Sequence, residues 1–341
     1  MRRLCSFFGK TEEKSTNLKK TIAKLYFKNL VKRASQQLNM KKHLLLIACL
    51  SLFSQCEAPP QEELKTGFDW QGHRGCRGLM PENTIPGFIE ALKYPIKTLE
   101  LDVVVAKDNE VIISHEPWML AAICSFPDGQ RVEASQEDSL LLYNLTYEEI
   151  KQFDCGKRGN ADFPEQKPMP AYKPSLEDAV IAIEEYCHTK GRALPIYNIE
   201  VKSKVKWDGV KIPGPELMAR LVIDQIAELD IQDRAYIQSF DLRILRAVRQ
   251  IDSTVATALL VANAKGIDGN IKELGYIPAT YSPHYAFVTH NVVERVHELG
   301  MMLVPWTIND SLVMKQMIQM GVDGIITDYP NYIEQVESTL E

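Results

Sequence analysis

The chain has 341 residues, of which 45% are hydrophobic and 25% are charged, proportions that are typical of a globular protein with one large domain or two average ones. The first 55 residues carry 12 Lys or Arg and 2 Asp or Glu, whereas the remainder carries 27 basic and 43 acidic residues, a balance of −16. This acidic balance argues against a protein that binds the phosphate backbone of nucleic acids, so we expect no nucleic-acid partner.

The first 39 residues are basic and show no clear pattern of apolar residues that would indicate a core. We interpret residues 1–39 as a non-native N-terminal extension and expect Met40 to be the true first residue. An amphipathic cytoplasmic extension is the alternative.

Residues 40–56 have the pattern of an export signal. Two lysines precede a short apolar run, which is far shorter than the ~20 residues that span a bilayer. The cysteine that closes the run, Cys56, resembles the lipid-bearing cysteine of bacterial lipoproteins, although Gln55 stands where a small residue is usual. We therefore predict an exported bacterial protein, periplasmic or anchored to the outer membrane by lipid on Cys56, with residues 57–67 as a flexible tether. A secreted protein without lipid is the alternative.

From residue 68 onward, short apolar and β-branched runs alternate with amphipathic helical stretches. We expect strands at 68–74, 97–105, 111–115, 195–202, 235–240, 255–261, 279–283, 301–307 and 323–328. We expect helices at 84–93, 175–189, 214–229, 241–251, 291–299 and 310–320. This alternation favours the α/β class with parallel strands, and the size fits a (β/α)₈ TIM barrel over residues 68–341. A doubly wound sheet is less suitable, because no G-x-G-x-x-G loop follows the first strand.

Residues 116–173 break this alternation. The segment is rich in Pro, Asp and Gly and has one short helical pattern, at 145–154. A long irregular stretch inside a barrel is usually functional or an inserted subdomain, so we predict an insertion after the second or third strand. Cys124 and Cys155 bracket part of it and can form a disulfide in an oxidising compartment. No paired C-x-x-C spacing indicates a zinc site.

Acidic residues mark two of the expected strands. Glu100 and Asp102 are two positions apart on one strand, and Glu200 and Lys202 share a face of another. Carboxylates inside a barrel are costly unless a positive charge pairs with them. Three inward carboxylates near the carboxyl ends of the strands would form an oxygen site suited to one divalent cation, Ca²⁺ or Mg²⁺.

Two histidines end expected strands, His73 at the first and His115 at the third. Imidazoles titrate near neutral pH and can serve as a general acid and a general base. Arg74 adds a planar fork of donors that recognises phosphate oxygens. The combination suggests a site for a phosphoryl group.

Eight short motifs, in this order, resemble the glycerophosphodiester phosphodiesterase family, within the phospholipase C-like phosphodiesterase superfamily. They are HRG, PENT, ELDV, SHEP, IEVKS, QSFD, VPWTIN and GVDGIITDYP, and the similarity covers about residues 69–337. Matched by motif, the resemblance implies metal ligands, a catalytic histidine pair, phosphate-binding cations and an aromatic wall near the glycerol. In that order the residues are Glu100, Asp102 and Glu200; His73 and His115; Arg74 and Lys202; and Trp306.

Other residues of the motifs are expected to play supporting roles. Glu82 and Asn83 would position the first loop, and Gln238 and Phe240 would line the barrel mouth. Asp328, beside the last strand, is interpreted as a residue that caps a turn.

The resemblance implies metal-dependent hydrolysis of a small glycerophosphodiester to glycerol 3-phosphate and an alcohol, a reaction of the phosphoric diester hydrolases. One departure affects specificity: Glu116 follows His115 where many relatives have aspartate, and the loop after it differs. One alternative is a sphingomyelinase D-like enzyme, or another phosphodiester hydrolase or lyase, that acts on lipids. The other is an exported binding lipoprotein without turnover.

Overall fold

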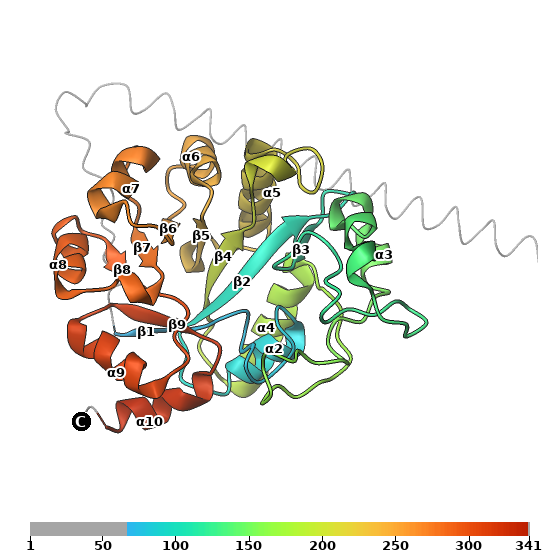
Figure 1. Ribbon diagram of the computed structural model, residues 1–341, viewed down its shortest axis with the longest axis horizontal. Coiled ribbons are helices and arrows are strands. Elements are labelled where there is room, and N and C mark those ends of the chain that lie inside the picture. Colours follow the sequence, from blue (N-terminus) through green and yellow to red (C-terminus); the bar gives the residue numbers. More distant parts are fainter. Residues whose placement is uncertain (1–66, 340–341) are drawn as a thin grey trace, which may run out of the picture. The chain divides into compact units, whose positions relative to one another are not determined.

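Eight parallel strands form the central sheet of the protein, whose computed structural model describes residues 67–339 (Figure 1). Neighbouring strands follow the order β8-β7-β6-β5-β4-β2-β1-β9. The strands are β1 (Asp69–Gly72), β2 (Thr98–Val105), β4 (Ile196–Val201), β5 (Ala235–Ser239), β6 (Thr257–Val261), β7 (Thr280–Pro283), β8 (Met302–Leu303) and β9 (Gly324–Thr327). Almost all of their residues are buried, as expected for parallel strands that pack on both faces.

The first and last members of this order, β8 and β9, meet through irregular backbone. Asp323 N donates to Leu303 O at 2.9 Å, and Ile326 N donates to Pro305 O at 3.1 Å. Ile308 N then donates to Ile326 O at 3.0 Å. These hydrogen bonds bring the sheet close to a full ring, and the expected (β/α)₈ TIM-barrel class is confirmed.

Helices alternate with the strands and surround the sheet (Figure 1). They are α2 (Ile85–Ala91), α4 (Leu176–Lys190), α5 (Pro215–Glu228), α6 (Leu242–Ile251), α7 (Gly266–Leu274), α8 (His290–Glu298), α9 (Ser311–Met320) and α10 (Ile333–Glu337). The side chains of Ser175, Asp241 and Asp310 each accept a hydrogen bond from a backbone N–H of the first helical turn. α7 is not among the helices expected from the sequence, because Gly266 and Gly269 lower its helix propensity.

The expected third strand is not part of the barrel. β3 (Val111–Ile113) turns back along β2 and pairs with it antiparallel, with Val103 opposite Ile113. The next barrel strand after β2 is therefore β4, and the insertion lies between these two strands of the barrel.

The insertion has a small hydrophobic core of its own, which includes residues of β2 and β3. Its short helix, α3 (Tyr147–Ile150), ends in the buried Ile150. Cys124 and Cys155 form a disulfide, the pairing that the sequence allowed. The buried members of the core are Val104, Ala106, Ile112, Met119, Ile123, Cys124, Val132, Leu142, Ile150, Phe153 and Cys155. The predicted insertion is thus a subdomain that packs on the face of the β2–β3 hairpin that carries Val104 and Ile112.

Several interpretations of the sequence fall outside the described residues. They concern the extension over 1–39, the export signal over 40–56 with its lipid on Cys56, and the tether up to residue 66. These stay predictions. Within residues 67–339, no helix is both long enough and apolar enough to cross a membrane.

Candidate active site

The side chains singled out in the sequence meet at the carboxyl ends of the barrel strands. Glu100 and Asp102 lie on β2, Glu200 lies on β4, and His73 directly follows β1. Asp102 and Glu200 are direct partners in the parallel register of β2 and β4, so the two strands bring their carboxylates together. TIM-barrel enzymes place their active sites at this end of the barrel.

The three carboxylates form a close acidic cluster. One oxygen each from Glu100, Asp102 and Glu200 lies within 4.8 Å of the others, and all three residues are buried. Burial, and then the carboxylates of Asp102 and Glu200, raise the pKa of Glu100 well above its usual range. Burial also raises the pKa of Glu200, although Lys202 opposes this effect. Like charges this close favour the binding of a cation among them.

Asp102 differs from the other two acids because cations face it. Arg74 Nε lies 3.2 Å from Asp102 Oδ2, and Lys202 Nζ lies 3.5 Å from Asp102 Oδ1. Burial works to raise the pKa of Asp102, but Arg74 and Lys202 outweigh it and hold this pKa well below its usual range. Asp102 Oδ1 is buried and accepts no hydrogen bond. Such an oxygen, beside two further carboxylates, suits a hard divalent cation.

Residues of the first loop and of β5 hold the acidic cluster in place. Asn83 Nδ2 donates to Asp102 Oδ2 at 2.8 Å, and Gln238 Nε2 donates to Glu100 Oε1 at 2.8 Å. The backbone N–H of Arg74 donates to Glu100 Oε2 at 2.9 Å. Arg74 and Asn83 both have a positive φ, 50° and 55°, which is uncommon for residues other than glycine and often marks functional sites.

A buried carboxylate from the end of the barrel holds His73. His73 Nδ1 lies 2.7 Å from Asp328 Oδ1. The Asp328 carboxylate also accepts hydrogen bonds from Arg77 Nε at 2.8 Å and from Asn309 Nδ2 at 2.7 Å. His73 Nε2 then lies 3.9 Å from Glu100 Oε2, at the acidic cluster. Burial lowers the pKa of His73 to about 4, although Asp328 opposes this effect.

The second histidine has a similar arrangement. His115 Nδ1 lies 2.7 Å from Glu116 Oε1, so the residue that departs from the usual aspartate still holds the imidazole. Burial works to raise the pKa of Glu116, but the hydrogen bond and the charge of His115 lower it. Each histidine thus has Nδ1 bound to a carboxylate and Nε2 left for another partner.

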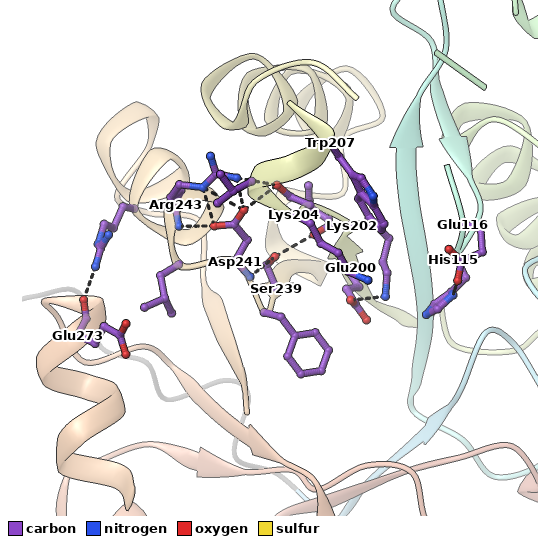
Figure 2. A pocket seen from close by; sticks show the side chains of 16 residues that line it. His115, Glu116, Glu200, Lys202, Lys204, Trp207, Ser239, Asp241, Arg243 and Glu273 are labelled. Atoms are coloured by element: carbon purple, nitrogen blue, oxygen red, sulfur yellow. Dashed lines mark hydrogen bonds and ion pairs between the residues drawn. The ribbon is translucent and has the colours of Figure 1, made fainter. Parts of the chain in front are cut away.

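Two adjoining cavities open at this end of the barrel. The catalytic cavity, of about 180 Å³, contains His73, Arg74, Glu100 and Trp306 among its lining residues. The outer cavity, of about 640 Å³, is lined by Glu116, Lys204, Trp207, Asp241 and Arg243 among others (Figure 2). Four residues line both cavities: His115, Glu200, Lys202 and Phe240.

Trp306 forms part of the wall of the catalytic cavity, where the sequence analysis expected an aromatic side chain. Its indole Nε1 donates to Ser282 O at 2.8 Å. The Trp306 and Phe240 rings pack edge to face, with 5.3 Å between their centroids. The indole orientation is therefore set by β7 and by a residue that directly follows β5.

Comparison with known proteins identifies this arrangement. The model of the glycerophosphoryl diester phosphodiesterase family matches residues 73–332, a span that contains every residue of the cluster described above. The chain belongs to this family. It is an enzyme, a phosphoric diester hydrolase that acts on glycerophosphodiesters.

Individual relatives and solved structures are similar to this chain over most of its length. A glycerophosphodiester phosphodiesterase of Bacillus altitudinis is 28% identical over 272 residues, which cover 79% of this chain and 98% of the relative. A solved structure from Silicibacter pomeroyi, assigned to the same family, is 26% identical with a TM-score of 0.71, and 80% of this chain and 94% of that one are covered. A phosphodiesterase of Oleispira antarctica, solved in complex with its product sn-glycerol-3-phosphate, is 22% identical with a TM-score of 0.63, over 79% and 96% of the two chains.

Two buried residues of this glycerophosphoryl diester phosphodiesterase were missed in the sequence. Asp328 was interpreted as a turn cap, whereas its carboxylate holds His73 and Arg77. The available signal was its position at the carboxyl end of a barrel strand. Lys173, at the end of the insertion, is buried and donates to Ser114 Oγ at 2.7 Å, next to His115. Burial lowers the pKa of Lys173 to about 8.

We predict that Asp328→Asn lowers kcat by at least ~10-fold and leaves KM nearly unchanged. The amide removes the charge that orients His73 Nδ1, and Asp328 itself is fully buried and outside the lining of both cavities. Steady-state kinetics with glycerophosphocholine measures both constants, and a thermal melt checks that the variant is folded.

The matched control is Asp323→Asn, at the opposite end of β9, where the carboxylate faces His297 near the surface. It is expected to keep wild-type kcat. Partial recovery in Asp328→Glu would support a role in positioning His73. Wild-type kcat in a folded Asp328→Asn variant would show that His73 needs no carboxylate partner.

Proposed function

We propose that the protein hydrolyses glycerophosphodiesters to glycerol 3-phosphate and an alcohol, with one divalent cation and with His73 and His115 as the acid–base pair. The observation that carries the proposal is the meeting of three buried carboxylates with two imidazoles, each tied through Nδ1, at one end of the barrel. Glycerol 3-phosphate is the product bound to the Oleispira antarctica enzyme, and for this chain it is part of the proposal.

Glu100, Asp102 and Glu200 would hold the cation, Ca²⁺ or Mg²⁺, because carboxylate oxygens are the ligands that both ions prefer. When bound, such a cation neutralises negative charge on the phosphoryl group. Arg74 and Lys202 supply further positive charge and donors for phosphate oxygens. Trp306 would form the wall beside the glycerol.

The two cavities suggest how the histidines divide the proton transfers. His73 lines the catalytic cavity, and its Nε2 would accept the proton of the attacking hydroxyl. His115 lines both cavities, so its Nε2 would donate a proton to the oxygen of the alcohol as the phosphorus–oxygen bond breaks. The attacking oxygen belongs either to water or to the glycerol 2-hydroxyl, which would first give a cyclic phosphate.

An assay of glycerophosphocholine and glycerophosphoethanolamine hydrolysis, with and without chelator, tests the proposal. Glycerol 3-phosphate is expected as product, and chelator is expected to stop its release. A final cyclic phosphate from lysolipid or sphingomyelin would instead indicate a sphingomyelinase D-like enzyme. Saturable binding without release of any phosphomonoester, whichever divalent ion is added, would indicate a binding lipoprotein.

We also propose that the protein is exported and held in the periplasm or at the outer membrane of a bacterium by lipid on Cys56. The signal-like pattern over residues 40–56 supports export, and the disulfide between Cys124 and Cys155 fits an oxidising compartment. Metabolic labelling with palmitate should mark the wild type and not Cys56→Ser. Equal labelling of both would rule out this anchor.

A further inference from the structure

The outer cavity lies where the alcohol of a bound diester would extend. It shares His115, Glu200 and Lys202 with the catalytic cavity, and it is the larger of the two, about 640 Å³ against about 180 Å³. A phosphate placed against the carboxylate cluster would therefore direct its glycerol into one cavity and its alcohol past His115 into the other. This inference rests on the proposed function and concerns which alcohol the enzyme prefers.

The acidic side chains in the wall of the outer cavity already have cationic partners. Figure 2 shows this wall from His115 and Glu116 on one side to Glu273 on the other. The closest distances between carboxylate oxygen and cationic nitrogen range from 2.6 to 2.7 Å in these pairs. The pairs are Glu116 with His115, Glu200 with Lys202, Asp241 with Arg243, and Glu273 with Lys265. A cationic alcohol such as choline would have to compete with these partners for each carboxylate.

Two cations of this wall, Lys204 and Arg246, have no carboxylate partner within the described part of the chain. The guanidinium of Arg246 donates to the backbone oxygens of Leu274 and Glu273, whereas Lys204 has no such donor contact there. Its side chain is exposed, and no carboxylate oxygen of residues 67–339 lies within ion-pair distance of its Nζ. Instead, Lys204 Nζ lies 4.5 Å from the centroid of the Trp207 ring (Figure 2). The amino group thus occupies an aromatic face on which a quaternary ammonium could otherwise bind. Lys204 thus presents its positive charge to the outer cavity and keeps a cationic group away from the Trp207 ring.

We propose that Lys204 makes the outer cavity a subsite for alcohols that carry an anionic group, such as a carboxylate. An anionic group can pair with Lys204 Nζ without displacing any existing ion pair. A quaternary ammonium would meet the like charge of Lys204 where it approaches Trp207. The preference for an anionic alcohol therefore has two causes, attraction of the anionic group to Lys204 and repulsion of a quaternary ammonium by the same charge.

Glycerophosphoserine and glycerophosphoethanolamine test the proposal, because their alcohols differ by one carboxylate. The wild type is expected to have a kcat/KM up to about fivefold higher for glycerophosphoserine, since a solvent-exposed ion pair contributes at most about 1 kcal/mol. Lys204→Ala should remove this preference. The same change uncovers Trp207 and should raise kcat/KM for glycerophosphocholine by about twofold or more.

Lys206→Ala is the matched control, since Lys206 is exposed, lies two positions away and does not line the cavity. It should keep the wild-type preference. Equal kcat/KM for the two substrates in the wild type, an unchanged preference in Lys204→Ala, or the same loss in Lys206→Ala would each overturn the assignment of the subsite. Failure to cleave any of the three diesters would instead contradict the proposed function, so the two failures are distinct.

Discussion

Glu200→Gln is expected to lower kcat/KM for glycerophosphocholine by about 10²- to 10⁴-fold, because a bound cation contributes several kcal/mol to stabilising the charge that develops on the phosphoryl group. The amide keeps the size of the side chain but removes one of the three carboxylates that face one another across β2 and β4. Chelation of divalent ions should reduce the activity of the wild type to a similar extent, and addition of Ca²⁺ or Mg²⁺ should restore it.

A second measurement separates loss of cation binding from loss of catalysis. A cation that binds only the folded protein raises its melting temperature. The wild type should therefore melt at a higher temperature with Ca²⁺ or Mg²⁺ than with chelator, and Glu200→Gln should show a much smaller difference. Glu185→Gln, at an exposed position on α4, serves as the control for both measurements. A Glu200→Gln variant with wild-type activity and wild-type cation response would remove the residue from the cation site.

His73→Ala and His115→Ala are each expected to lower turnover by at least ~10²-fold, the usual contribution of a positioned general acid or base. Both imidazoles have Nδ1 bound to a carboxylate, so Nε2 is the atom whose loss matters. His188→Ala, at an exposed position on α4, should leave turnover unchanged.

A substrate with a better leaving group distinguishes the two histidines. 4-Nitrophenolate departs without protonation, so His115→Ala should regain much of its activity with a glycerophosphoryl 4-nitrophenyl diester. His73→Ala should stay impaired with that substrate, since its proposed role is to accept the proton of the attacking hydroxyl. The reverse pattern would exchange the two roles. Near wild-type turnover in either variant with glycerophosphocholine would remove that histidine from the mechanism.

Local patterns were enough to predict the barrel and its acids. The two-residue spacing of Glu100 and Asp102 on a strand places both side chains on one face, whatever surrounds that strand. The same reasoning applied to Glu200 on β4, and the structure brings all three acids together. These predictions held because the alternation of side chains along a strand is set by the backbone itself.

Patterns of this kind could not reveal partners that are distant in the chain. His73 and Asp328 are 255 positions apart, and only the near closure of the barrel, with β9 beside β1, makes them neighbours. From the sequence alone, Asp328 was therefore interpreted as a local turn residue. Residues 111–115 were likewise expected among the other strands, because a run of β-branched residues does not specify whether its strand pairs parallel or antiparallel.

The sequence by itself determined the alternation of strands and helices, the insertion, and the residue types at the strand ends, because each depends on a few neighbouring residues. The tertiary structure alone decided which carboxylate holds each imidazole, that Lys204 Nζ lies over Trp207, and that two cavities meet at His115. Those features depend on how separate loops pack at one end of the barrel, and no run of neighbouring residues specifies that packing.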